Sequence, residues 1–233
     1  MYENIRVTAV IAAAGKGSRM NSHINKQYIM LKDKPVLAHT LTGFEKCGSI
    51  DTIIVVAAPE DIDYCRKSIV DRFCLTKVRA ILAGGQTRQQ SVARGLEAVE
   101  DGIVVIHDGA RPFVDCDLVE AGIGLLLEKN LDGAACALPV RDTVKLVGPD
   151  QVVERTLDRE KIRAVQTPQC FLRRPVAKAH KRATREGIEA TDDLALLEHY
   201  EYRVGLYAGR YDNIKITTPE DLLLARVLME GRN

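Results

Sequence analysis

The sequence lacks an excess of charge of either sign. Its 33 lysine and arginine residues nearly balance 32 aspartate and glutamate residues, so the formal net charge is +1 over 233 residues. Proteins that bind nucleic acid or other polyanions over a wide surface usually carry a strong positive field. We therefore expect no nucleic-acid partner, and any anion-binding site must be local.

Long hydrophobic runs and a basic leader are also absent from the sequence. No run approaches the ~18 apolar residues that a membrane span requires. Residues 1–15 contain an apolar run, but no basic stretch precedes it and no cleavage box follows, so the segment does not resemble a signal peptide. We therefore expect no membrane partner and a cytoplasmic location.

Cysteine is scarce, and the six cysteines are scattered along the chain. They form no C-x-x-C pair and no short regular spacing of the kind that marks a zinc site or a redox pair. We expect them to be small buried hydrophobic side chains in a reducing compartment, with one reactive thiol as the alternative. The six are Cys47, Cys65, Cys74, Cys116, Cys136 and Cys170.

What the sequence does contain is the ordinary composition of a folded domain. Hydrophobic residues make up 46% and charged residues 28% of the chain, which argues against disorder, collagen-like repeats and a disulfide scaffold. The length of 233 residues is within what one large α/β domain can hold. No internal repeat, low-complexity tract or linker is visible, so we expect residues 1–233 to form a single domain.

Short apolar runs alternate with amphipathic segments from one end of the chain to the other. The runs are expected to be strands, at 7–12, 52–57, 78–82, 103–106, 134–140 and 204–207. The segments between them are expected to be helices, at 35–48, 59–73, 91–99, 117–129, 175–186, 192–200 and 219–229, with Thr191 and Thr218 as N-caps of the last two. This alternation predicts an α/β fold with a doubly wound, mostly parallel, Rossmann-like sheet.

Residues 142–162 break the alternation. Two runs of alternating hydrophobicity flank a Gly148-Pro149-Asp150 turn, which predicts a protruding β-hairpin arm. A two-stranded arm cannot bury both of its faces alone. We therefore expect it to pack against a partner chain, with a solvated hairpin as the alternative.

The first expected strand runs into a glycine-rich, basic loop. Small residues at Ala13 and Ala14 and glycines at Gly15 and Gly17 let the backbone approach a ligand closely, and its N–H groups can hold phosphate oxygens. Residues 15–34 contain five lysine or arginine residues against one aspartate. This local excess indicates an anionic ligand; a tight turn with incidental lysines is the alternative.

Two better-known glycine motifs do not fit this loop. A P-loop needs G-x-x-x-x-G-K-[ST], whereas a single residue, Lys16, separates Gly15 from Gly17. A dinucleotide fingerprint needs a small residue where Met20 stands and an acidic residue near Ala57, at the end of the second strand. The loop therefore belongs to neither class.

Polar residues follow two further strands at the edge of the sheet where α/β proteins bind ligands. Asp108 ends the fourth expected strand, where a carboxylate can hold Mg²⁺ or a ribose hydroxyl, or simply cap the next helix. His107 is expected to be a hydrogen-bonded structural histidine rather than a base. Residues 84–91, which follow the third strand, offer further backbone groups at the same edge.

Nine motifs, in order and covering nearly the whole chain, resemble those of the 2-C-methyl-D-erythritol 4-phosphate cytidylyltransferase family. They are A-A-G-K-G-S-R-M (13–20), K-Q-Y (26–28), G-G-x-x-R-x-x-S-V (84–92), H-D-G-A-R-P (107–112), P-V-R-D-T (139–143), T-L-D-R (156–159), T-P-Q (167–169), T-D-D (191–193) and N-I-K-I-T-x-P-E-D (213–221). The resemblance implies a nucleotidyltransferase that joins CTP to methylerythritol phosphate and releases pyrophosphate in the non-mevalonate route to isoprenoids. It also implies Mg²⁺ dependence and a homodimer formed through the arm.

The resemblance implies roles for the residues at matching positions. CTP would be bound by Ala13, Ala14, Gly15, Gly17, Gly85, Ser91, Asp108 and Gly109, with Asp108 near the ribose and the metal. The catalytic cations would be Arg19, Lys26, Lys215 and Arg159, the last supplied by the partner's arm. The acceptor would meet Arg111, Thr143, Thr167 and Thr191. Two departures from the family are Ala12, where proline is frequent, and Gln86, where an acidic residue can help to read the base.

Two other functions fit parts of the same pattern. A ribitol 5-phosphate cytidylyltransferase would share the fold, the CTP loop and the mechanism, and turnover with each acceptor distinguishes the two. A non-catalytic nucleotide sensor would be expected to have lost a key cation, yet Arg19, Lys26, Arg159 and Lys215 are all present.

Overall fold

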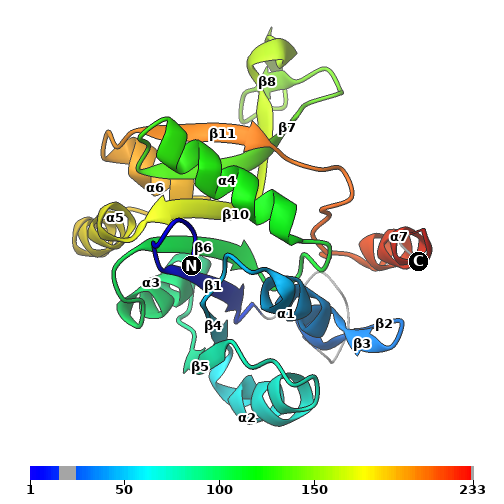
Figure 1. The fold of residues 1–233 in the computed structure, drawn as a ribbon. Coiled ribbons are helices and arrows are strands. Elements are labelled where there is room, and N and C mark those ends of the chain that lie inside the picture. Colours follow the sequence, from blue (N-terminus) through cyan, green and yellow to red (C-terminus); the bar gives the residue numbers. More distant parts are fainter. Residues whose placement is uncertain (16–24, 232–233) are drawn as a thin grey trace.

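The computed structural model describes residues 1–15 and 25–231, and a seven-stranded sheet runs through its middle (Figure 1). The strand order is β11-β7-β10-β6-β1-β4-β5. The strands are β1 (Val7–Ala13), β4 (Thr52–Ala57), β5 (Val78–Ala83), β6 (Ile103–Asp108), β7 (Gly133–Pro139), β10 (Arg163–Leu172) and β11 (Val204–Ala208). Neighbours pair in parallel except where β10 lies antiparallel between β6 and β7. The expected doubly wound, mostly parallel sheet is confirmed.

Helices cover both faces of this sheet and enclose two hydrophobic cores. One face carries α1 (Val36–Lys46), the short α2 (Ile62–Tyr64) and α4 (Cys116–Glu128); the other carries α3 (Arg88–Glu97), α5 (Arg173–Glu186) and α6 (Asp193–His199). Because β1, β4 and β6 are buried on both faces, their sequences are continuous apolar runs rather than alternating ones. The last helix, α7 (Pro219–Glu230), packs beside the small β2 (Met30–Leu31) and β3 (Lys34–Pro35) sheet.

Strand β10 is the strand of the seven-stranded sheet that the sequence pattern did not predict. Its first three residues are exposed, and it contains Pro168, which cannot donate to a strand ladder. The ladder to β7 shifts register between Val165 and Gln169, so the proline lies at an irregularity where no ladder hydrogen bond is required. Because of the exposed start and the internal proline, the sequence of β10 shows neither a continuous apolar run nor a regular alternation of apolar and polar residues.

Two helix expectations need correction. Residues 59–73 do not form one α-helix, because a 3₁₀ turn at Pro59–Asp61 leads through α2 into a π-helical segment at Cys65–Asp71. The N-cap of α6 is Asp192 rather than Thr191, since the Ala195 N–H donates to the Asp192 carboxylate at 2.9 Å. Thr218 does cap α7, in a capping box with Asp221.

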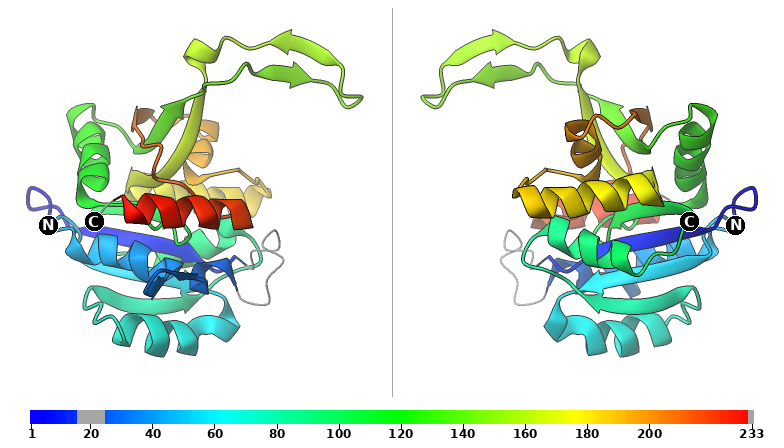
Figure 2. Two further views of the ribbon diagram at one scale, coloured as in Figure 1. Left: turned by 90° about the vertical axis from the view of Figure 1, so that its right-hand side faces the viewer. Right: turned by 90° about the vertical axis from the view of Figure 1, so that its left-hand side faces the viewer.

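The predicted arm is a β-hairpin that projects from the body of the molecule (Figure 2). Strands β8 (Lys145–Val147) and β9 (Val153–Thr156) pair only with each other. The arm exposes apolar side chains that its own chain does not cover, among them Leu146, Val147, Val152 and Val153. Its packing against a partner chain stays a prediction.

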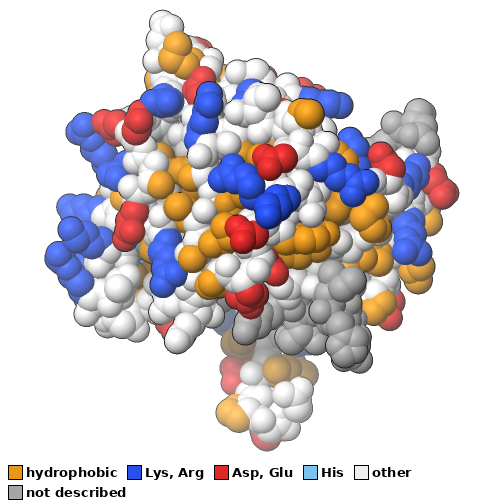
Figure 3. Space-filling model, turned by 90° about the horizontal axis from the view of Figure 1, so that it is seen from below, with side chains coloured by type: hydrophobic (Ala, Val, Ile, Leu, Met, Phe, Trp, Pro, Cys, Tyr) orange, Lys and Arg blue, Asp and Glu red, His pale blue; other side chains and the backbone are white. Residues whose placement is uncertain are grey.

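The surface agrees with the near-neutral composition. Acidic and basic side chains are interspersed over the face drawn in Figure 3. None of the helices in residues 1–15 and 25–231 combines the length and the hydrophobicity of a membrane span.

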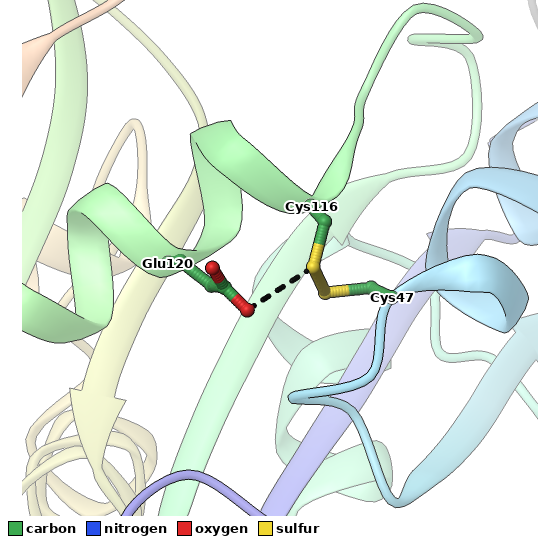
Figure 4. A group of neighbouring side chains, drawn as sticks. All are labelled: Cys47, Cys116 and Glu120. Carbon is green, nitrogen blue, oxygen red and sulfur yellow. Dashed lines mark hydrogen bonds between the residues drawn. A yellow bond between two sulfur atoms is a disulfide. The ribbon is translucent and has the colours of Figure 1, made fainter.

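The expectation that all six cysteines are buried side chains without a covalent partner is wrong for three of them. Cys47, which ends α1, and Cys116, which begins α4, form a disulfide (Figure 4). The carboxylate of Glu120 lies 3.3 Å from the Cys116 sulfur. The pair was invisible to spacing analysis because 69 residues separate its members. Of the other cysteines, Cys65, Cys136 and Cys170 are buried as expected, whereas Cys74 is exposed.

We expect the Cys116→Ser substitution to lower the free energy of unfolding by about 2–4 kcal/mol, because the cross-link restricts a long loop of the unfolded chain. The measurement is thermal unfolding of the parent and the variant, each with and without a reductant. Reductant should bring the parent down to the variant's stability, while Cys74→Ser, a change at an exposed cysteine, should stay near the parent. Equal unfolding temperatures for all samples would show that the cross-link is not formed.

Candidate active site

The carboxyl ends of β1, β4, β5 and β6 open into a cavity of about 800 Å³. This is the edge at which open α/β sheets bind ligands. Of the residues that the sequence singles out, it is lined by Ala13, Ala14, Gly15, Lys26, Gly85, Ser91, Asp108 and Lys215. Residues far apart in the chain are therefore brought to one cavity, and Gly17 and Arg19 lie outside the described residues.

Two backbone segments meet tightly at one wall of this cavity. A Cβ atom at Gly84 would lie only 2.4 Å from the Cβ of Ala14, so this position excludes any side chain. The Gly84 N–H donates to the Ala57 carbonyl at 2.7 Å, and the Gly85 N–H donates to the Ser91 hydroxyl at 3.1 Å. Glycine here lets the loop after β5 approach the loop after β1, which leaves a narrow, backbone-lined wall.

Lys26 begins a short 3₁₀ turn, Lys26–Tyr28, that is anchored to the end of β1. The Gln27 amide donates to the Ala13 carbonyl at 2.7 Å, and both residues are buried. Because the neighbouring residue is held by the strand, the Lys26 backbone is fixed at the cavity wall.

Asp108 is a buried carboxylate surrounded by cations. Its Oδ2 lies 2.8 Å from the Lys215 Nζ and 3.6 Å from the Arg111 Nε, and its Oδ1 lies 3.2 Å from the Arg88 Nε. Burial alone would raise the pKa of this carboxyl, but Arg88, Lys215 and Arg111 outweigh it and hold the pKa far below its usual range. Asp108 therefore stays ionised, and the cations leave the cluster with a surplus of positive charge that an anion can balance.

Behind this cluster, hydrogen bonds between residues of three sequence motifs tie β6, β10 and the chain before α7 together. The Asp108 N–H donates to the Thr167 hydroxyl at 3.1 Å, and Arg111 donates to the Asn213 carbonyl at 2.7 Å. The Ile216 N–H donates to the Ala110 carbonyl at 2.9 Å, which places Lys215 over Asp108. Arg111, Thr167 and Lys215 thus lie together around Asp108.

His107 has the structural role expected of it. Its ring is fully buried, with Nδ1 3.1 Å from the Thr167 hydroxyl and Nε2 3.2 Å from the Arg111 carbonyl. Burial lowers the pKa of His107 to about 3, so the ring is neutral near pH 7. It holds the strand end in place and is not a proton carrier at that pH.

Six described residues of the predicted site do not line the cavity. Gly109, Arg111 and Thr167 are bonded to residues that do line it, Ala12 and Asp108, and the other three are different. Thr143 precedes β8 of the arm, Arg159 follows β9, and Thr191 is exposed before α6. None of the three lines the cavity. The Arg159 guanidinium donates to the Arg141 carbonyl at 3.0 Å and lies 3.8 Å from Glu160. Gly109 is close to the cavity, because its N–H donates to the Ala12 carbonyl at 2.9 Å.

Arg88 is the functional candidate that sequence reasoning missed. It lines the cavity and forms an ion pair with Asp108, and its Nη2 is buried with no hydrogen-bond partner among the described residues. A buried donor without an acceptor is costly unless a ligand supplies one. The signal was present as the arginine of the motif G-G-x-x-R, but no charge partner could be assigned to it from spacing.

Comparison with known proteins agrees with this geometry. The sequence profile of the 2-C-methyl-D-erythritol 4-phosphate cytidylyltransferase family matches residues 7–231. The proteins of that name from Clostridium novyi and Clostridium acetobutylicum are 47% and 48% identical to this chain, over 96% and 95% of it and 96% of each relative. The crystal structure of 4-diphosphocytidyl-2C-methyl-D-erythritol synthase from Anaerococcus prevotii superposes with a TM-score of 0.86 at 31% identity, covering 98% of this chain and 97% of that one. A family match of this length, with the motif residues gathered at one cavity, establishes that the chain belongs to the 2-C-methyl-D-erythritol 4-phosphate cytidylyltransferase family.

Proposed function

We propose that this enzyme transfers the cytidylyl group of CTP to 2-C-methyl-D-erythritol 4-phosphate and releases pyrophosphate. The observation that carries the proposal is the cavity itself, in which a backbone-lined wall, Lys26 and the cluster around Asp108 lie within one space. A nucleotide needs all three: close backbone contacts for its base and phosphates, cations for its charge, and a polar anchor for its ribose. Family membership supplies the identity of the two substrates.

The proposed chemistry needs no general base. A phosphate monoester has a second pKa near ~6, so the acceptor phosphate is already largely dianionic at neutral pH. One of its oxygens attacks the α-phosphorus of CTP, a new P–O bond forms, and the bond from that phosphorus to the β-phosphate oxygen breaks. The electron pair leaves with pyrophosphate, and no proton needs to be removed from the nucleophile.

What the reaction does need is relief of negative charge, because two polyanions must approach each other. Lys26 at the cavity wall and Lys215 above Asp108 are placed to balance charge on the α-phosphate and on the incoming phosphate. Arg19 is proposed for the same task, although it lies outside the described residues. The acceptor phosphate is proposed to meet Arg111 and Thr167 beside the cluster.

The residues present fit a magnesium ion that the substrate helps to bind. Mg²⁺ in such sites is held by one or two carboxylates together with substrate phosphates, and Asp108 and Glu60 are the acidic residues among those described at the cavity. Asp108 would hold the ion, which would supply charge neutralisation for the phosphates. The Lys215 Nζ lies 2.8 Å from the Asp108 Oδ2 in this structure. With the ion bound to Asp108, Lys215 would be available to the acceptor phosphate.

We expect the Asp108→Asn substitution to raise the Mg²⁺ concentration needed for half-maximal activity by about 10-fold or more, because it removes the charge that a hard cation prefers. The measurement is a magnesium titration of the initial rate, with thermal unfolding as the control for folding. A variant that unfolds at a lower temperature but titrates with Mg²⁺ like the parent would assign Asp108 a purely structural role.

We also propose a cytoplasmic homodimer in which each arm packs against the partner. The exposed apolar residues of β8 and β9 support this arrangement, as does the failure of Arg159 and Thr143 to reach their own cavity. In such a dimer, both residues would serve the site of the partner chain.

The experiment that tests the function is pyrophosphate release from CTP with a panel of polyol phosphates. We expect kcat/KM for methylerythritol phosphate to exceed that for ribitol 5-phosphate by a wide margin. The relatives compared above bear the methylerythritol name, and none of those names mentions ribitol phosphate. A preference for ribitol 5-phosphate, or no release with any acceptor, would refute the assignment.

A further inference from the structure

The guanidinium of Arg88 joins two buried carboxylates that come from different parts of the fold. Its Nε lies 3.2 Å from Asp108 at the end of β6, and its Nη1 donates to Asp193 at the start of α6 at 2.7 Å. The contact with Asp193 is the shorter of the two. An arginine can bridge two acceptors in this way because its donors form a planar fork.

Asp193 is held from its other side as well. Its Oδ1 accepts a hydrogen bond from the Nε2 of His180 on α5 at 3.0 Å, while its Oδ2 accepts from Arg88. The side chains of Asp193 and His180 are 1% and 3% exposed. Burial alone would raise the pKa of Asp193, but Arg88 and His180 outweigh it and lower the pKa, so the carboxylate is charged. Because an ionised carboxylate only accepts hydrogen bonds, Nε2 of His180 carries the proton.

These contacts form a buried chain from α5 to the cavity: His180 to Asp193, Asp193 to Arg88, and Arg88 to Asp108. Arg88 and Asp108 line the cavity, whereas Asp193 and His180 do not. A long, flexible arginine side chain that faced a water-filled cavity with one carboxylate partner would have several conformations. The second carboxylate, itself fixed by a histidine, selects one of them.

We propose that Asp193 and His180 are positioning residues for the nucleotide site: they fix the Arg88 guanidinium, and Arg88 in turn fixes the Asp108 carboxylate. The proposal rests on the function proposed above for its kinetic readout. Its binding readout, the affinity for CTP, does not depend on turnover.

The first test is the Asp193→Asn substitution, which keeps the shape of the side chain and removes its charge. We expect kcat/KM for CTP to fall roughly 10- to 100-fold, because this is the effect of losing one hydrogen bond to a charged group. The dissociation constant for CTP, measured by calorimetry, should rise in parallel. The KM for the acceptor should change by no more than a few-fold, because the hydrogen bonds of the Asp193 carboxylate to described residues go to Arg88 and His180, neither of which is assigned to the acceptor.

The second test uses a conservative pair at His180. Gln can still donate a hydrogen bond to Asp193, whereas Leu cannot, and the two side chains are similar in size. We expect His180→Gln to retain most of the parent's CTP affinity and His180→Leu to lose it about as Asp193→Asn does. This split separates positioning from packing, because both variants disturb the packing of α5.

Two control variants address stability and general charge effects. Val176→Ala removes a fully buried side chain from the same helix without touching the chain of contacts, so it should lower the unfolding temperature and leave CTP affinity unchanged. Asp101→Asn breaks an exposed ion pair with Arg174 and should change neither property by much.

The outcomes separate the positioning role from the proposed function. Unchanged CTP affinity in Asp193→Asn, or equal losses in His180→Gln, His180→Leu and Val176→Ala, would overturn the positioning role. If the parent binds CTP but turns over no acceptor, the proposed function fails, and the CTP affinities of the variants still decide the positioning role. A parent that does not bind CTP refutes both.

Discussion

Replacing Lys26 with alanine is expected to lower kcat by about 10²- to 10³-fold while KM for the acceptor changes only a few-fold. A preorganised charge that meets the transition state is typically worth about 3–4 kcal/mol, which is the loss that this factor represents. The position of Lys26 is fixed because Gln27 binds the Ala13 carbonyl at the end of β1. Arg19→Ala is expected to have an effect of the same size.

The measurement is a single-turnover rate at saturating concentrations of both substrates, which separates the chemical step from binding. Lys46→Ala removes an exposed lysine from the last turn of α1 and serves as the matched control, with a rate expected to equal that of the parent. If the Lys26→Ala rate lies within a few-fold of the parent's, Lys26 is a surface charge and not a catalytic residue.

The second large effect is expected at Arg159, and it should depend on the dimer. Arg159 does not line the cavity of its own chain, and it begins the 3₁₀ turn Arg159–Lys161 that follows β9 of the projecting arm (Figure 2). From a partner's arm, its guanidinium fork can bind two oxygens of the acceptor phosphate. We expect Arg159→Ala to lower kcat/KM on the order of 10²-fold.

Mixing two inactive variants tests the direction of this contact. In a heterodimer of Arg159→Ala and Lys26→Ala chains, one site combines an intact Lys26 with an intact Arg159 from the partner, so activity should return. Arg155, an exposed arginine of β9, supplies the control, since Arg155→Ala should be active on its own. If mass spectrometry shows subunit exchange but no activity returns, Arg159 acts in its own chain and the crossed arm is refuted.

Periodicity predicted most of the central sheet, most plainly β1, β4 and β6, which are buried on both faces and therefore have continuous apolar sequences. All six expected strands begin within one residue of the observed start, and the largest difference at an end is in β6, which continues beyond Ile106 to Asp108 at the site. β10 could not be predicted in this way, because its exposed start and Pro168 break the apolar run. The extended conformation of β10 depends on its antiparallel hydrogen bonds to β6 and β7, which are not adjacent to it in sequence.

The site was predictable as a set of residue types but not as a set of contacts. Gly15, Lys26, Asp108 and Lys215 were placed at one site by their motifs, and the structure gathers them around one cavity. The charge pairing around Arg88 was not predictable, because it joins the first residue of α3 to β6 and to α6. The same reason hid the Cys47–Cys116 disulfide: each depends on long-range packing that leaves no local pattern.

The central claim is that the acceptor phosphate attacks the α-phosphorus of CTP, and an oxygen label tests it most directly. Methylerythritol phosphate carrying ¹⁸O in its phosphate group is incubated with unlabelled CTP and the enzyme, and both products are analysed by mass spectrometry. We expect the diphosphocytidyl product to retain every labelled oxygen and the pyrophosphate to contain none. Label in the pyrophosphate, or release of CMP with the acceptor unchanged, would contradict the mechanism.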